Sequence, residues 1–121
     1  MRTPISYTLA WPSRIETPSK RLDLGAISTL RFEPPDETRF PALRLAREAL
    51  NSGGAAATVL NAANEVAVEA FSERQLSYMG ITESVAAVMA AHEVVAQPAL
   101  EEILEADSWA RNAAQNVILD A

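Results

Sequence analysis

Carboxylates at helical spacing are the residues of this sequence with the clearest capacity for chemistry. There are two groups, one of Glu65, Glu69 and Glu73 and one of Glu101, Glu102 and Glu105. Such groups can bind a divalent cation or act as an acid and a base. No EF-hand or Glu-x-x-His pattern accompanies them, and no neighbouring residue would raise the pKa of a carboxyl group. We therefore predict that both groups lie on solvated helix faces, and we identify no metal ligand.

His92 is the only histidine, and we place it near the middle of the apolar face of a helix. A histidine can act as an acid, a base or a metal ligand. Here no cysteine and no second histidine can join it, and the neighbouring Glu93 should point elsewhere on the helix. We expect a partly buried, hydrogen-bonded histidine rather than a catalytic one.

Asn61 and Asn64 lie one helical turn apart at the edge of an apolar face, where they could position a ligand. A buried asparagine more often satisfies backbone carbonyls or sets the register of a bundle, and we favour that structural role. Gly53 and Gly54 precede a helix, and such junctions can bind phosphate. The pair lacks a GxGxxG or Walker pattern and follows a helix, so we predict a C-cap and tight turn. The residues alone therefore indicate no catalytic site.

The helix predicted from about Ala55 to Gln75 is the element around which the others must pack. Its apolar residues cover a wide arc of the helix surface: Val59, Leu60, Ala63, Val66, Ala67, Ala70 and Phe71. A helix that is apolar over so much of its circumference needs neighbours on several sides. We predict that it is the central member of a helical bundle.

The sequence from residue 40 to residue 121 predicts four main helices and one short helical segment. The first starts at Pro41 and ends at the glycine pair, and its predicted apolar stripe comprises Phe40, Leu43, Ala46, Ala49 and Leu50. Gly80 is the predicted N-cap of the third main helix. Gln97–Pro98 opens the short segment, which ends at Leu104, and Asp107 is the predicted N-cap of the last helix.

Residues 1–12 are predicted to form a short helix, because Pro4 is tolerated in a first turn and Pro12 would end the run. Residues 13–39 have no helical periodicity and read as an extended linker that crosses the surface of another domain. The expected fold class is therefore all-α: a four-helix-type bundle over residues 40–121, preceded by one short helix and an extended linker.

The net charge of −6 is unevenly distributed. Residues 1–40 carry six basic and five acidic side chains, whereas residues 41–121 carry four basic and eleven acidic ones. An acidic helical region repels nucleic acid and anionic membranes, so we expect neither as a partner. The chain has no run of about 18 apolar residues, no signal-peptide h-region and no cysteine, as is typical of a cytoplasmic protein.

Three stretches together resemble one enzyme family: MRTPISYTLAWPSRI at 1–15, RFPALRLAREAL at 39–50 and LNAANEVAVEAF at 60–71. Their order and spacing are similar to the C-terminal part of the 1-deoxy-D-xylulose 5-phosphate reductoisomerases of the non-mevalonate isoprenoid pathway. The linker LDLGAISTLRFEPPDETRF and the segment ADSWAR also resemble that family, in which ADSWAR would begin the last helix. The family usually has an aspartate cap where this sequence has Gly80.

The resemblance implies an oxidoreductase about three times this length, usually a homodimer. Such an enzyme converts 1-deoxy-D-xylulose 5-phosphate into 2-C-methyl-D-erythritol 4-phosphate with NADPH and a magnesium or manganese ion. The family's binding residues precede the part matched here, so we expect no catalytic residue, cofactor or metal ion on this chain and no activity from it alone. Met1 resembles a methionine near the nicotinamide and substrate, and it is the single near-site contact that we expect.

Two functions remain open at this point. In the first, the chain is the C-terminal part of the reductoisomerase and braces the remaining domains, which are its partners. In the alternative, it is a free-standing helical interaction module without enzymatic activity.

Overall fold

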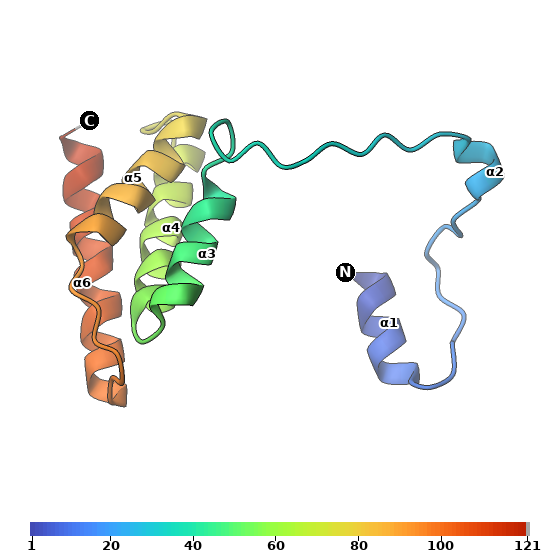
Figure 1. The fold of residues 1–121 in the computed structure, drawn as a ribbon, viewed down its shortest axis with the longest axis horizontal. Helices are drawn as coiled ribbons and strands as arrows, with labels where there is room; N and C mark the ends of the chain where they lie inside the picture. The colour runs from blue at the N-terminus through green and yellow to red at the C-terminus, as the bar shows by residue number, and fades with distance from the viewer. Residues whose placement is uncertain (121) are drawn as a thin grey trace. The chain divides into compact units, whose positions relative to one another are not determined.

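The computed structural model describes residues 1–120, which form six α-helices and no β-strand (Figure 1). The helices are α1 (Arg2–Ala10), α2 (Leu24–Ile27), α3 (Ala42–Ser52), α4 (Ala56–Ser72), α5 (Tyr78–Ala91) and α6 (Leu100–Leu119). The all-α prediction is confirmed. None of these helices has the length and apolar character that a membrane span requires. The chain divides into two compact units, one of Met1–Pro34 and one that begins at Pro35.

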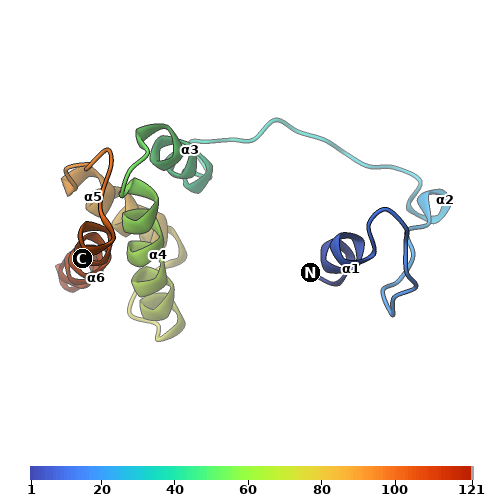
Figure 2. The ribbon, with the colours of Figure 1, turned by 90° about the horizontal axis from the view of Figure 1, so that it is seen from below.

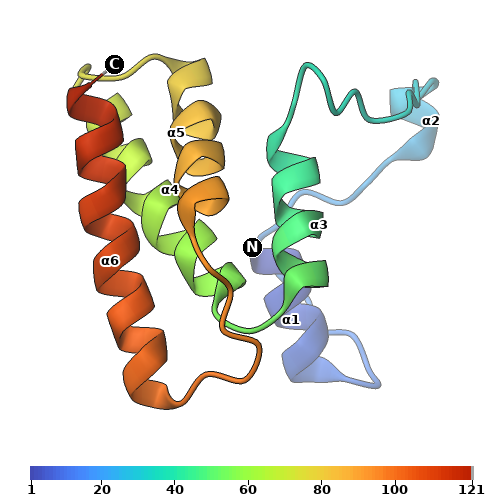
Figure 3. The same ribbon diagram turned by 60° about the vertical axis from the view of Figure 1, so that its left-hand side comes forward.

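The second unit is built around α4, as the sequence predicts. This helix packs against α3, α5 and α6, and α5 also packs against α6 (Figures 2 and 3). The wide apolar arc of α4 explains this position, because neighbours on three sides are needed to remove it from water. The helix is shorter than predicted, since a turn that includes Arg74 at φ 64° ends it before Gln75.

Small side chains make up most of the core between α4 and α6. Ala62, Ala63 and Ala67 of α4 have no exposed surface, and neither do Ala110 and Ala114 of α6. Alanine on both helices lets the two backbones approach closely, and it also gives both helices high intrinsic helix propensity. Composition and packing therefore favour the same structure here.

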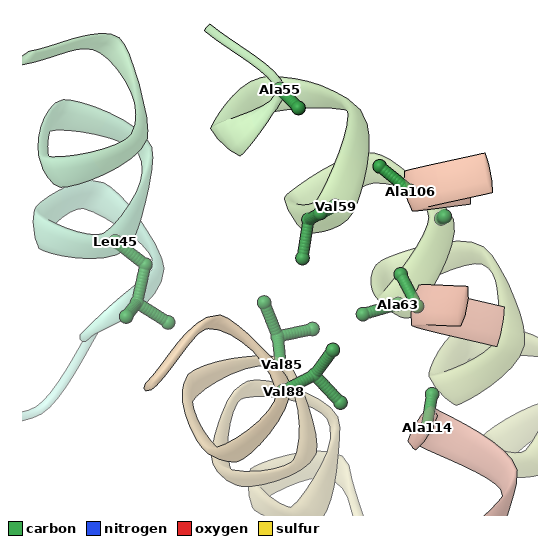
Figure 4. Packing of buried hydrophobic residues seen from close by; sticks show 10 residues of the cluster. Leu45, Ala55, Val59, Ala63, Val85, Val88, Ala106 and Ala114 are labelled. Atoms are coloured by element: carbon green, nitrogen blue, oxygen red, sulfur yellow. The ribbon is translucent and has the colours of Figure 1, made fainter. Parts of the chain in front are cut away.

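Larger apolar side chains fill the space between α3, α4 and α5. Leu45 of α3, Val59 of α4 and Val85 and Val88 of α5 are buried together (Figure 4). The buried residues of α3 are Leu45 and Ala49, whereas Leu43 and Leu50 are exposed. The predicted stripe of α3 is thus wrong as a description of the core: apart from Ala49, it does not contain the residues that α3 buries.

Two predicted helix starts are also wrong. The N-cap of α5 is Ser77, whose side-chain hydroxyl accepts a hydrogen bond from the backbone N–H of Gly80 at 3.0 Å. Gly80 lies buried inside the first turn, where the side chain of Leu76 occupies the space that a Cβ would need. The last two predicted segments form one continuous helix, so Asp107 lies inside α6 and is not a cap. At its true start, the carboxylate of Glu102 accepts a hydrogen bond from the N–H of Ala99.

The first unit contains α1, α2 and irregular chain. Helix α1 ends at Ala10, and the Tyr7 and Trp11 rings meet edge to face with centroids 5.7 Å apart. Helix α2 is a single turn that the sequence analysis does not predict, and Asp23 caps it by accepting a hydrogen bond from the N–H of Ala26. The rest of residues 13–34 is irregular. The expected domain limits at residues 12/13 and 39/40 stay a prediction.

We predict that Ala63→Glu unfolds the bundle or nearly so. Ala63 has no exposed surface, so the new carboxylate would be buried without a partner at a cost of about 3–5 kcal/mol, much of the stability of a small domain. Urea denaturation followed by circular dichroism measures this. Ala57→Glu, on the exposed side of α4, is the matched control and should leave stability nearly unchanged. A cooperatively melting Ala63→Glu protein of unchanged stability would contradict the central placement of α4.

Candidate functional site

The most extensive polar cluster of the bundle joins α4 to α6 through Arg111. The Arg111 guanidinium donates to Glu65 across the helix pair at 2.7 Å and to Asp107, one turn away on α6, at 2.8 Å. Asn61 donates from its side-chain amide to the second oxygen of Glu65 at 3.0 Å. Glu65 is exposed, as the sequence predicts. It also accepts hydrogen bonds from two donors, which the sequence does not predict.

The electrostatics of this cluster favour charged, paired groups. Hydrogen bonds from Arg111 and then Asn61 lower the pKa of Glu65. Hydrogen bonds to Asp107 and then to Glu65 raise the pKa of Arg111. A general acid or base needs a pKa near neutrality, and these shifts move both groups away from it. The cluster is suited to fastening α4 to α6, and it is not suited to proton transfer.

The remaining acidic residues do not converge. Glu69 is exposed on α4, and Glu73, the exposed C-cap of that helix, accepts a hydrogen bond from the side chain of Gln75. Glu101 and Glu105 are exposed on α6. Among residues 1–120, no group of three or more histidine, cysteine, aspartate or glutamate side chains is placed so that it could hold a metal ion.

The prediction that His92 lies on the apolar face of a helix is wrong, because His92 is the C-cap of α5. Helix α5 ends at Ala91, and His92 has extended backbone angles of φ −87° and ψ 129°. The departure of the chain from α5 lets the carbonyl of Val95 accept a hydrogen bond from the N–H of Ala55 at 3.3 Å. The expected partial burial is confirmed, because the ring of His92 packs against that of Trp109 with centroids 5.3 Å apart. The expected hydrogen bond of its side chain stays a prediction.

Gly53 and Gly54 form the predicted C-cap and turn. Both have positive φ angles, of 68° and 51°, and the N–H of Gly53 donates to the carbonyl of Ala49. A Cβ on Gly54 would lie only 1.9 Å from the carbonyl oxygen of Val95. Glycine at 54 therefore permits the α3–α4 turn to lie directly against the segment between α5 and α6.

The two asparagines are exposed, so the prediction of a buried asparagine pair is wrong. The side-chain amide of Asn61 donates a hydrogen bond to Glu65, and Asn61 and Glu65 are both exposed on α4. Met1, the single near-site contact expected from the sequence, is 91% exposed in the first unit. Its predicted role stays a prediction.

Sequence reasoning missed the link between Glu65 and Arg111. The i,i+4 spacing of Asp107 and Arg111 is visible in the sequence and typical of a helix pair. The pairing of Glu65 with Arg111 spans 46 residues and depends on how α4 packs on α6. No local pattern contains that information.

The sequence of this chain is similar to that of one protein family over most of its length. Residues 1–113 match the family model described as DXP reductoisomerase C-terminal domain. The 1-deoxy-D-xylulose 5-phosphate reductoisomerase of Chlorobium chlorochromatii is 51% identical over 118 residues, which are 98% of this chain and 31% of that protein. The chain thus spans about a third of the length of the curated relatives that it matches.

Two solved structures are similar over nearly the whole chain. The reductoisomerase from Zymomonas mobilis in complex with NADPH shares 43% identity with a TM-score of 0.81, covering 97% of this chain and 31% of that one. A reductoisomerase in complex with magnesium shares 35% identity with a TM-score of 0.83, covering 98% of this chain and 32% of that one.

We predict that the link between Glu65 and Arg111 makes stability depend on pH below about pH 5. The pKa of Glu65 is lowered in the folded state, so this contribution is present above the unfolded-state value of about 4.3 and disappears as the pH falls through the folded-state value. In Arg111→Met, the loss of stability between about pH 5 and pH 3 should be smaller than in the unsubstituted chain. Urea denaturation at several pH values measures this difference.

Arg74→Met is the control for that measurement, because Arg74 lies exposed in the turn after α4. Its pH dependence should equal that of the unsubstituted chain. If Arg111→Met also behaved like the unsubstituted chain, the ion pair would contribute nothing to stability in solution.

Proposed function

The chain belongs to the 1-deoxy-D-xylulose 5-phosphate reductoisomerase family, as its C-terminal domain, and from this premise we propose that it is the supporting domain of such an enzyme. The observation that carries this proposal is the coverage of the match. Nearly all of this chain aligns with the relatives, yet it corresponds to only 31% of the Chlorobium chlorochromatii enzyme. The chemistry would then depend on the remaining two thirds.

The proposed parent reaction is the conversion of 1-deoxy-D-xylulose 5-phosphate into 2-C-methyl-D-erythritol 4-phosphate with NADPH and a magnesium or manganese ion. Residues 1–120 do not form a binding site for NADPH or for the metal ion. Their carboxylates do not converge, and the glycines at 53 and 54 join two helices, whereas a dinucleotide site is built from a strand, a glycine-rich turn and a helix. NADPH and the metal ion would therefore bind to the other domains.

In this proposal the domain acts through its rigidity and its surface. The α4–α6 core and the link between Glu65 and Arg111 hold one fixed shape, against which the other domains can pack. Those domains are its partners, in an enzyme that acts as a cytoplasmic homodimer. Met1 is the single residue proposed to lie near the nicotinamide and substrate, where its exposed, flexible side chain can pack against them.

We predict that the purified 121-residue chain turns over no 1-deoxy-D-xylulose 5-phosphate and shows no saturable NADPH binding. The physical reason is the lack of a pyrophosphate-binding turn and of converging metal ligands among the described residues, together with the negative charge of residues 41–121, which repels phosphorylated ligands. NADPH fluorescence titration with and without Mn²⁺ measures binding, and NADPH oxidation measures turnover.

The control is the whole Chlorobium chlorochromatii enzyme under the same conditions. A second protein carries this chain in place of the matching part of that enzyme and should retain turnover. Saturable binding or turnover by the 121-residue chain alone would contradict the proposal. A folded chimera without turnover would favour the free-standing interaction module.

A further inference from the structure

The outward side of α3 is an apolar face that the bundle leaves uncovered. Leu43, Ala46 and Leu50 follow one another at spacings of three and four residues, so they share one side of the helix. Leu43 is 46% exposed and Leu50 is 78% exposed. We call these three residues the α3 outer face. The adjacent side of the same helix buries Leu45 and Ala49 against the bundle.

The apolar arc of α3 is wider than the part that the bundle buries. A surface helix normally shows one apolar stripe toward the core and a polar side toward water. Apolar positions at i, i+3 and i+7 are the pattern by which a helix docks into a groove of another polypeptide. Helix α3 therefore has the composition of a helix packed between the bundle and a second surface.

The charged residues of α3 are paired within the chain. Arg47, beside the α3 outer face, pairs with Glu37, and Arg44, farther round the helix, pairs with Glu48 at 2.6 Å. An apolar centre with a paired, polar rim is the usual composition of a protein–protein interface. The rim charges are already neutralised within the chain, so a partner surface can cover the apolar centre without leaving an unpaired charge.

Charge distinguishes α3 from the other helices of the bundle. Its residues carry a net charge of +1, whereas those of α4, α5 and α6 carry −2, −1 and −3. Because Arg44 and Arg47 of α3 are both paired with carboxylates, this difference does not by itself select the occupant of the face.

We propose that the α3 outer face is the surface through which this domain docks on the preceding, catalytic part of the reductoisomerase. The inference rests on the proposed function and identifies the surface by which the supporting domain would contact the catalytic part. Relatives are about three times longer than the matched region, so a large polypeptide is available. The chain that precedes α3 would connect this helix to the catalytic part of the enzyme. Such a tether raises the effective concentration of the α3 outer face and the surface on which it docks. The occupant is thus an apolar patch of the same polypeptide chain.

The test uses the chimera in which this chain replaces the matching part of the Chlorobium chlorochromatii enzyme. The double variant Leu43→Gln/Leu50→Gln removes the apolar contact, and Leu100→Gln/Leu104→Gln is the matched control, because these leucines of α6 are 64% and 60% exposed. In the isolated 121-residue chain, both double variants should melt within about 2 °C of the unsubstituted protein, since all four side chains already face solvent.

In the chimera, the α3 variant should lower the midpoint of thermal unfolding by about 5 °C or more, and the α6 control should not. The backbone amides of α3 should also exchange at least tenfold more slowly in the unsubstituted chimera than in the isolated chain. Equal midpoints for the two double variants, or equal α3 exchange in chimera and isolated chain, would overturn the inference.

Two further outcomes separate the inference from its alternatives. An isolated chain that sediments as a dimer and becomes monomeric in Leu43→Gln/Leu50→Gln would show that a second copy covers this face, and the inference would be wrong. A chimera without turnover would defeat the proposed function. The unfolding and exchange comparisons would still decide whether α3 docks.

Discussion

The close approach of α4 and α6 is the constraint on which the rest of the bundle depends. Ala62, Ala63 and Ala67 face the other helices without any exposed surface, and α6 meets them with Ala110 and Ala114. Because these side chains are so short, the two backbones come together with little room for a larger residue. The helices α3 and α5 then pack against this pair through larger side chains. The stability of the bundle therefore depends on small residues at a few fixed positions.

Polar contacts at the edge of this interface set its register. Arg111 can reach both Glu65 and Asp107 because α4 and α6 lie at one particular distance and offset. The exposed ion pair contributes modestly to stability. It nevertheless favours one register of α4 and α6, whose alanine side chains would allow several. At the end of the bundle where α4 begins, Gly54 and Val95 approach closely and restrain the two connecting segments.

The sequence was sufficient to predict what depends on long, regular periodicity. The wide apolar arc of α4 correctly predicted a central helix, and Gly53 and Gly54 correctly predicted a turn. Predictions that depended on one local choice were less successful. Ser77 and Gly80 are both acceptable N-caps, and the hydrogen bond that the Ser77 hydroxyl accepts from the N–H of Gly80 shows that Ser77 begins α5. Asp107 resembled a cap because nothing local revealed that α6 is continuous through it.

The proposed docking surface was harder to predict, because it is an apolar face and not a constellation of reactive groups. Leu43 and Leu50 belong to the apolar stripe that the sequence predicts, but periodicity shows that a helix has an apolar side and does not show which side faces the bundle. The exposure of Met1 and of the α3 outer face becomes meaningful only beside relatives that are about three times longer. In the proposed function, a domain of this kind would contribute to catalysis by shape and docking, with the reactive groups in the other domains.

The central claim is that the alanine-packed bundle is a complete folding unit that supports the catalytic domains. Native-state hydrogen exchange on the isolated 121-residue chain tests it most directly. We expect the amides of α4 and α6 to exchange only through global unfolding, whereas the amides of residues 1–34 exchange with little protection. Uniform protection of both units, or rapid exchange throughout α4, would contradict this claim.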